Sequence, residues 1–156
     1  MRVQLTINRK PHVLELNGHE TLLEALRDKL GMTGTKTACQ ESECGTCAVM
    51  INGRSRLSCI TLAANCEGEE ITTIEGLADG DNLHPVQQAF VEHGSSQCGF
   101  CIPGMIISSV ALLQKNPKPT QEEIEYGLDG NICRCAGYPK IFEAVRQAGE
   151  VMHKEK

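Results

Sequence analysis

The sequence is poor in aromatic residues and in long apolar runs. It has no tryptophan, two tyrosines and three phenylalanines among its 156 residues. This composition argues against an aromatic-rich core and against an aromatic platform on which nucleic-acid bases stack. No apolar run approaches the roughly 18 residues of a membrane-spanning helix. The alternating, polar amino terminus lacks the apolar stretch of a secretory signal. We therefore expect a soluble, cytoplasmic chain without a membrane span.

Concentrated positive charge and catalytic motifs are also missing. The net charge is -5, and the 15 lysines and arginines are scattered rather than gathered in a stripe. A nucleic-acid-binding surface would need such a stripe, so this class of function is excluded. The chain carries no Rossmann glycine fingerprint, no P-loop and no paired nucleophile and base. We predict no catalytic residue in it, and any substrate chemistry must occur on partner chains.

Cysteine, in contrast, is abundant. The chain has nine cysteines, and in a reducing cytosol such a number indicates metal or redox chemistry rather than disulfides. Eight of them form two quartets, which are Cys39, Cys44, Cys47 and Cys59, and Cys98, Cys101, Cys133 and Cys135. Thiolates gathered in this way need a metal to neutralise their charge. The ninth, Cys66, is expected to be a packed apolar thiol.

The first half of the chain reads as a small mixed sheet with one helix. Residues 2–8 alternate apolar and polar side chains, which predicts a strand. Residues 12–16 supply its hairpin partner, with Val13, and Leu14 or Leu16, facing the core.

After this hairpin, Thr21 and Glu24 have the spacing of a capping box before an apolar, helix-like series. A stretch with little periodicity then holds the first three cysteines. Asn52-Gly53 predicts a two-residue hairpin turn, and residues 70–74 form a last short strand.

The second half reads as helical. Residues 76–82 are rich in glycine and aspartate and indicate a linker. Helices are then predicted over residues 86–93, from Pro103 onward, from the Thr120–Glu123 capping box, and over residues 138–152. We expect four helices here.

The first quartet has the spacing of a plant-type 2Fe–2S ferredoxin, with Cys59 closing the site from the adjacent hairpin. A single loop supplies three thiolates and must bend sharply to aim backbone N–H groups at sulfur, a need that Gly45 meets. The alternative is structural zinc, which more often uses two CxxC-like knuckles.

The second quartet joins a CxxC pair to a CxC pair, each just before a predicted helix. Two helix N-termini would then face one negatively charged cluster. On spacing alone zinc fits this quartet nearly as well. The neighbouring ferredoxin-like quartet favours a second 2Fe–2S cluster.

Several segments together resemble the small iron–sulfur subunit of the molybdenum hydroxylases, the xanthine dehydrogenase and aldehyde oxidase family. They are ECGTCAV (43–49), SCITLA (58–63), TIEGL (73–77), HPVQQAFVEHG (84–94), QCGFCIPGMI (97–106) and GNICRCAGY (130–138). They follow the order of that family from the first cluster loop to the last helix.

The resemblance implies an α+β chain in which a plant-ferredoxin-like β-grasp domain precedes an all-α four-helix domain. The implied bounds are residues 1–76, a linker over 77–84 and residues 85–156. It further implies one 2Fe–2S cluster in each domain, with the eight quartet cysteines as ligands. Gln97 and Cys135 match positions that approach the pterin of the molybdenum cofactor across a subunit boundary.

The implied function is electron transfer from molybdenum through both clusters to FAD. The implied partners are a molybdopterin-binding large subunit and an FAD-binding medium subunit, in a heterotrimer or its dimer. Xanthine or another purine is the first substrate to consider, with aldehydes, N-heterocycles, carbon monoxide and aromatic CoA thioesters as alternatives. A free-standing ferredoxin-like carrier and a zinc-stapled interaction module are the other classes of function.

The chain departs from the family pattern at a few positions beside the ligands. Ser42 stands where the family usually has glycine, and Thr46 and Ala48 replace the commoner alanine and threonine. Ile102 and Ala136 each replace a threonine. None of these changes removes a ligand, so their expected effect is on the hydrogen bonding and potential of the clusters.

Overall fold

The first hairpin shows which of its apolar side chains face the core. The computed structural model describes residues 1–154. Strand β1 (Arg2–Ile7) buries its alternating apolar side chains as predicted and pairs antiparallel with β2 (Lys10–Glu15). The prediction for Val13 is wrong, since 51% of this residue is exposed, whereas Leu14 and Leu16 are buried. Leu14 lies opposite the buried Val3, and residues opposite each other in a sheet share a face.

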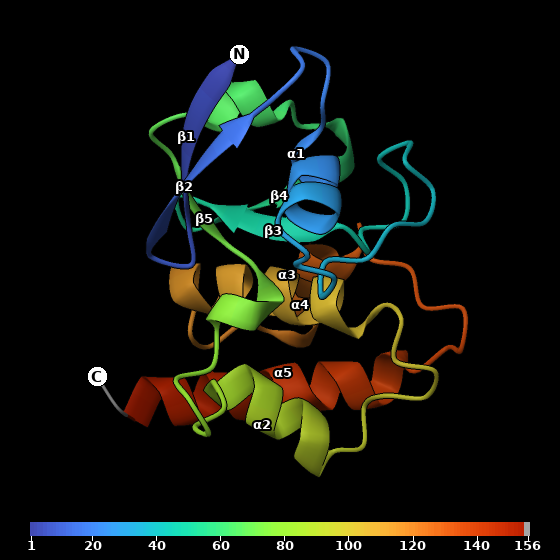
Figure 1. Cartoon of the computed structure of the whole chain (residues 1–156). Helices are drawn as coiled ribbons and strands as arrows, with labels where there is room; N and C mark the ends of the chain where they lie inside the picture. Colours follow the sequence, from blue (N-terminus) through green and yellow to red (C-terminus); the bar gives the residue numbers. More distant parts are fainter. Residues whose placement is uncertain (155–156) are drawn as a thin grey trace.

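Three further strands complete a five-stranded sheet of order β2-β1-β5-β3-β4 (Figure 1). The hairpin β3 (Ala48–Ile51) and β4 (Arg54–Leu57) turns at Asn52 and Gly53, both with left-handed backbones, as the Asn-Gly signal predicts. Strand β5 (Glu70–Thr72) lies between β1 and β3, parallel to the first and antiparallel to the second. The predicted mixed sheet is confirmed.

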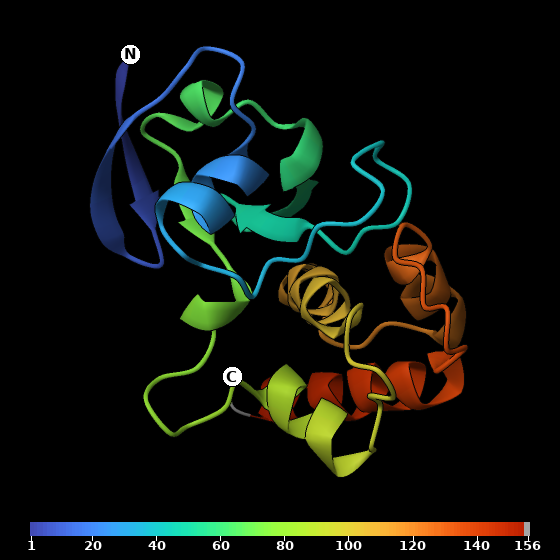
Figure 2. The ribbon, with the colours of Figure 1, turned by 45° about the vertical axis from the view of Figure 1, so that its right-hand side comes forward.

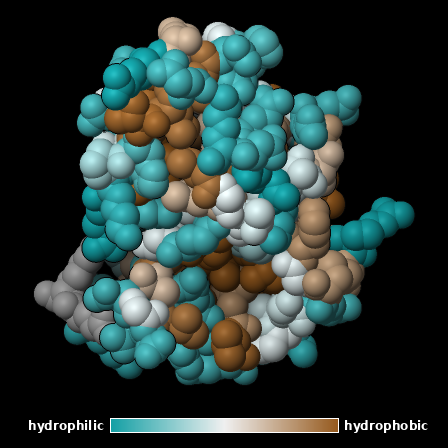
Figure 3. All heavy atoms as spheres, viewed as in Figure 1, coloured by the Kyte–Doolittle hydropathy of each residue, from teal (hydrophilic) through white to brown (hydrophobic). Residues whose placement is uncertain are grey.

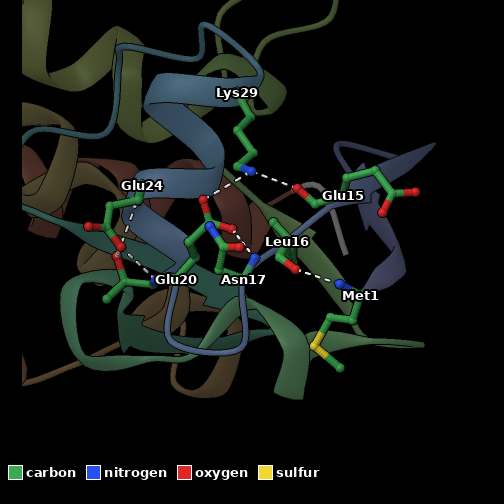
Figure 4. Close-up of polar contacts among 8 residues, drawn as sticks. Met1, Glu15, Leu16, Asn17, Glu20, Glu24 and Lys29 are labelled. Carbon is green, nitrogen blue, oxygen red and sulfur yellow. Dashed lines mark hydrogen bonds and ion pairs between the residues drawn. The ribbon is translucent and has the colours of Figure 1, made fainter.

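One short helical segment covers the sheet on the side of β1. Helix α1 (Leu22–Glu24) continues as a π-helical stretch (Ala25–Lys29) and begins with the predicted Thr21–Glu24 capping box. Figure 4 shows how the preceding connection is held. Lys29 donates to the carbonyl of Glu15 at 2.6 Å and pairs with Glu20 at 3.0 Å. The helical segment is thereby fastened to the end of β2.

The second half consists of four helices, as predicted. They are α2 (Pro85–Glu92), α3 (Ile102–Lys115), α4 (Gln121–Leu128) and α5 (Tyr138–Lys154). Helix α3 has proline in its first turn, and α4 begins with the predicted Thr120–Glu123 capping box. Helix α5 runs beside α2 (Figures 1 and 2). Helix α5 buries Ile141, Ala144, Val145 and Ala148, whereas Val151 near its end is exposed.

Strand β3 joins the two halves because its faces belong to different cores. Val49 packs with the core of β1 and α1. Ala48 and Met50 pack with the core of the four helices, where α3 runs against this face of the sheet. Figure 2 shows α3 between the sheet and the helices α2 and α5. In the described part of the chain, no helix is both long and apolar enough to cross a membrane. The domain bounds at 76 and 84 stay a prediction.

Candidate metal centres

The loop that carries Cys39, Cys44 and Cys47 bends through three left-handed residues. Gln40, Ser42 and Gly45 have φ values of 56°, 63° and 69°. Alternation of this kind turns successive backbone N–H groups toward one side of the chain, where they form a concave anion site. The N–H of Glu41 donates to Cys39 Sγ at 3.5 Å. The sharp bend predicted for this loop is therefore present, and it is shared by two residues that are not glycine.

Cys59 reaches this loop from the end of the hairpin. It lies in a single 3-10 turn (Ser58–Ile60) directly after β4. The hydroxyl of Ser58 donates to the carbonyl oxygen of Cys47 at 2.7 Å, and the Ser58 N–H donates to the same oxygen at 3.3 Å. These two bonds place the Cys59 thiol beside that of Cys47, where it raises the pKa of Cys47.

The thiols of the first quartet differ in acidity. The N–H groups of Glu41 and Cys44 stabilise the Cys39 thiolate and lower its pKa to about 7. Burial raises the pKa of Cys47 to about 11; the N–H of Cys59 opposes this increase, and the Cys59 thiol adds to it. A buried thiol of this kind ionises at neutral pH only when a metal cation compensates its charge.

The second quartet is built from two turns at helix N-termini. Cys98 and Cys101 flank a turn in which Gly99 has a φ of 83°, and Cys101 is the N-cap of α3. Cys133 accepts a hydrogen bond from the N–H of Gly137 at 3.5 Å, just before α5 begins. Both predicted helix starts therefore contribute to one site.

The acidity pattern of the first quartet recurs in the second. The Phe100 N–H and the Cys135 thiol lower the pKa of Cys98, whereas burial raises the pKa of Cys101 to about 12. Burial would also raise the pKa of Cys133, but the Gly137 N–H and the Cys101 thiol outweigh it, so that this pKa is lowered. The interactions pair Cys98 with Cys135, and Cys101 with Cys133.

The donor set fits two 2Fe–2S clusters. All nine cysteines are free thiols, and the eight in the quartets interact in pairs. Among the described residues, no three cysteine, histidine, aspartate or glutamate side chains are grouped to hold a single metal ion. A 2Fe–2S cluster makes no such demand, because each iron takes two protein thiolates. Backbone N–H groups directed at sulfur are the kind of contact that stabilises such clusters.

Gln97 and Cys135, the two residues expected near the pterin, lie together in the structure. Gln97 Nε2 donates to the carbonyl oxygen of Cys135 at 2.9 Å. Gln97 is exposed and lies between α2 and α3, whereas Cys135 is half-buried and lies between α4 and α5. The structure therefore joins these two predicted residues, and their contact with a pterin stays a prediction.

The remaining candidates lie outside both sites. Cys66 is buried, donates to the carbonyl of Leu62 at 3.6 Å, and has a pKa raised by burial, which agrees with the predicted packed thiol. His84 and His93 are the N-cap and C-cap of α2.

Three residues hold the ligand loops in place; the sequence pointed to Thr46 only as a departure from the family pattern and gave no contact for Tyr138 or Asn131. The Tyr138 hydroxyl accepts from the N–H of Cys133 at 2.8 Å. Asn131 Nδ2 donates to the carbonyl oxygen of Gly45 at 3.0 Å, and Thr46 Oγ1 donates to that of Phe100 at 3.1 Å. Each follows or precedes a quartet cysteine by a few residues, and that proximity was the available signal.

Comparison with known proteins agrees with this geometry. Residues 5–78 match the 2Fe–2S iron-sulfur cluster binding domain, and residues 73–146 match the [2Fe-2S] binding domain. The chain is 44% identical to the aldehyde oxidoreductase iron-sulfur-binding subunit of Escherichia coli O157:H7, over 97% of this chain and 73% of that protein. It is 43% identical to the nicotinate dehydrogenase small FeS subunit of Eubacterium barkeri, over 95% and 94%.

The fold leads to the same group. Quinoline 2-oxidoreductase from Pseudomonas putida 86 superposes with a TM-score of 0.94 at 40% identity, covering 99% of this chain and 96% of that one. This chain belongs to the iron–sulfur subunits of the molybdenum hydroxylase family. It accordingly has the ferredoxin-like and helical 2Fe–2S binding domains of that family and is a subunit of an oxidoreductase.

The departures from the family pattern have distinct structural settings. Ser42 and Ala136 both have left-handed backbones, with φ values of 63° and 55°. The glycine usual at position 42 in the family adopts this conformation without steric cost, whereas serine does not. Ile102 is the first residue of α3 and packs against the helical core. Each quartet therefore has a departure from the family pattern at a left-handed position, Ser42 at the first and Ala136 at the second.

Proposed function

We propose that this chain is the electron-transfer subunit of a molybdopterin-dependent hydroxylase, with one 2Fe–2S cluster held by each cysteine quartet. The observation that carries the proposal is the direct contact between the loops of two complete quartets in one short chain. When bound, such clusters supply one-electron transfer. The chain itself provides thiolates, N–H groups that favour their ionised form, and a fixed spacing between the sites.

The proposed ligands follow the interacting pairs of thiols. For the first cluster they are Cys39 with Cys44 and Cys47 with Cys59, and for the second they are Cys98 with Cys135 and Cys101 with Cys133. Each pair fits the two protein thiolates that one iron takes.

The two sites have different outward surfaces, which supports an order of transfer. Gln97 and Cys98 are exposed beside Cys135, and this side is proposed to meet the pterin of a molybdopterin-binding subunit. At the first quartet, Glu41 and Glu43 are exposed, and this side is proposed to deliver electrons to FAD on a medium subunit. The proposed assembly is a heterotrimer or its dimer, in the cytoplasm.

Exposed apolar surface supports a subunit rather than a free carrier. A groove of about 350 Å³ is bounded by α2 and the start of α3, with Phe90, Val91 and Ile102 among its lining residues. Figure 3 shows apolar side chains gathered around a hollow on this face. Phe100 and Ile132, each beside a proposed ligand, are 48% and 51% exposed. Apolar surface of this kind marks a contact with another chain.

Purine hydroxylation is the first activity to test, but the chain offers no substrate-binding residue that favours it. The relatives above are named for aldehyde, nicotinate and quinoline substrates. Substrate choice must therefore be a property of the partner. Assays of the purified complex with a purine, an aldehyde, an N-heterocycle, carbon monoxide and an aromatic CoA thioester would identify the class.

The test of the proposed function is the metal content and the partners of the native protein. We expect iron and sulfide in equal amounts, two distinct 2Fe–2S signals in electron paramagnetic resonance (EPR) after reduction, and co-purification with two larger subunits. Zinc without a paramagnetic signal would overturn the electron-transfer role. Recovery of the native chain alone, as a stable monomer with both clusters, would overturn the subunit role and leave the free carrier.

A further inference from the structure

We propose that Thr46 and Asn131 are positioning residues that hold the two cluster-binding loops in contact and thereby set the electronic coupling between the clusters. The inference rests on the proposed function, because it assumes that both quartets hold clusters. Thr46 and Asn131, which are not ligands, would then have a role in electron transfer between the two clusters.

Thr46 connects the segments directly before one ligand of each site, the buried Cys47 and the half-buried Cys101. It precedes Cys47, it is 4% exposed, and its hydroxyl donates to the carbonyl oxygen of Phe100 at 3.1 Å. Phe100 in turn precedes Cys101. A buried hydroxyl needs a hydrogen-bond partner, and here the partner belongs to the helical half. The alanine commoner in the family at this position has no hydroxyl and could not form this bond.

Asn131 connects the same two loops on the side of Cys44 and Cys133. It is 5% exposed, and its Nδ2 donates to the carbonyl oxygen of Gly45 at 3.0 Å. The next backbone N–H, that of Ile132, donates to the carbonyl oxygen of Cys44 at 3.0 Å. The atoms between Cys44 and Cys133 are therefore the Cys44 carbonyl, one hydrogen bond and the backbone of Ile132.

The two loops approach so closely that side chains do not fit between them. A Cβ on Gly45 would lie 2.1 Å from the carbonyl oxygen of Gly130, and one on Gly104 would lie 2.5 Å from that of Gly45. Hydrogen bonds in such a buried contact are strengthened by the low local dielectric constant. Electron transfer between two centres slows steeply with their separation. Bonds that fix this contact therefore control the coupling.

The first experiment compares Thr46→Val with Thr46→Ser in the full chain with both clusters reduced. Valine keeps the shape of threonine and loses the donor, whereas serine keeps the donor. We expect Thr46→Val to lose or weaken the spin–spin splitting between the clusters in EPR, with the signal of each cluster retained. Thr46→Ser should restore the splitting. Asn131→Asp, which removes the amide donor, should weaken it further.

The matched control is Thr61→Val. The hydroxyl of Thr61 also donates to a backbone carbonyl, that of Leu57 at 2.9 Å, but both residues lie in the sheet half. This variant should leave the splitting at its wild-type value. If Thr61→Val and Thr46→Val lose the splitting to the same extent, the positioning role is overturned, because loss of any threonine hydroxyl would then explain the effect.

Amide hydrogen exchange provides a readout that does not depend on the spins. The N–H of Ile132 is held by the carbonyl of Cys44, so its exchange should accelerate in Thr46→Val and Asn131→Asp and stay unchanged in Thr61→Val. If the splitting and the exchange are both unchanged in Thr46→Val and both cluster signals are intact, the positioning role is overturned and the proposed function stands. Absence of both 2Fe–2S signals from the wild-type chain would instead overturn the proposed function, and the coupling with it.

Discussion

Each quartet presents four thiols, but the two quartets lie on different kinds of backbone structure. Three ligands of the first lie on one irregular loop whose bend depends on left-handed residues, and the fourth comes from a hairpin. The second is divided between two turns that open helices α3 and α5. The loop site bends through two left-handed residues that are not glycine, Gln40 and Ser42, whereas the helical site has one, Ala136, and also uses N-termini that favour negative charge.

Despite this difference, each site has a thiol whose pKa is lowered and one whose pKa is raised by burial. Cys39 and Cys98 have lowered pKa values, and Cys47 and Cys101 have raised ones. The two thiols of raised pKa adjoin the Thr46–Phe100 contact between the halves. Each site is therefore polarised, with its less accessible thiol toward the other site and its more accessible thiol toward the surface. Such an arrangement suits a chain that receives electrons at one surface and releases them at another.

The largest expected effect is loss of one cluster by removal of one ligand. Cys59→Ser should abolish the first 2Fe–2S signal and leave the second, because Cys59 belongs to the hairpin of the sheet half. Metal binding contributes folding free energy, so the sheet half should also unfold at lower temperature. Iron analysis, EPR and thermal unfolding check this.

The control for the lost ligand is Cys66→Ala, which removes a buried thiol outside the quartets. It should retain both signals and cost about 1 kcal/mol of stability. Loss of both clusters in Cys59→Ser would show that the two sites assemble as one unit rather than independently.

A smaller but still severe effect is expected where the two sites touch. Gly45→Ala places a Cβ 2.1 Å from the carbonyl oxygen of Gly130 at a residue with a φ of 69°. Strain and overpacking together should lower the free energy of unfolding by about 3 kcal/mol. Urea unfolding of the full chain measures this change.

Gly130→Ala is the matched substitution on the other side of this contact. A Cβ on Gly130 meets no atom within 4 Å, and its φ lies outside the left-handed region. Its cost should stay within about 0.5 kcal/mol. Equal costs for the two variants would contradict the close contact between the loops.

The acidity difference within each quartet predicts a pH-dependent pattern of alkylation in the cluster-free chain. Thiolate is the reactive form, and the pKa of Cys39 is lowered to about 7, so its reaction should rise as the pH increases through about 7 and fall below it. Cys47 and Cys101, with pKa values of about 11 and about 12, should stay protonated and unmodified across the neutral range. Peptide mass spectrometry after brief iodoacetamide treatment checks the order.

The same comparison predicts that Cys98 reacts before Cys101, because the pKa of Cys98 is lowered. Modification of Cys47 before Cys39, or of Cys101 before Cys98, would contradict the polarised arrangement of the two sites.

Local patterns in the sequence were sufficient for much of the fold, and they singled out the eight cysteines whose thiols interact in pairs in the structure. Capping boxes at Thr21 and Thr120, the Asn52-Gly53 turn and the first-turn Pro103 all depend on neighbouring residues, and the structure contains each of them. The prediction of which β2 side chains face the core was wrong for Val13. The buried face depends on the register of the hairpin, which places Leu14 opposite Val3.

The contacts between the quartets could not be predicted for a similar reason. Asn131 bonds to Gly45, and Thr46 bonds to Phe100, across distances in sequence that no periodicity reaches. They depend on how helix α3 packs against strand β3, and thus on tertiary structure. Tyr138, which accepts from the N–H of Cys133, belongs to a motif that was recognised but had no assigned contact.

The smallest expected effect concerns the strained residues beside each quartet. Ser42 is exposed and left-handed, with a φ of 63°, so Ser42→Gly should relieve backbone strain without losing packing. The greater entropy of glycine in the unfolded chain offsets part of the gain, which leaves about 0.5 kcal/mol of stabilisation. Urea unfolding measures it, and EPR of the reduced chain reports any change in the first cluster.

Two further substitutions make this last effect diagnostic. Ala136→Gly, with a φ of 55°, should give a similar gain and alter only the second signal. Ser96 is exposed and is not left-handed, so Ser96→Gly should instead cost about 0.5 kcal/mol. If Ser42→Gly and Ser96→Gly both destabilise equally, the left-handed serine carries no strain. The contrast between a strained loop site and a helical site supported by its N-termini would then have to be abandoned.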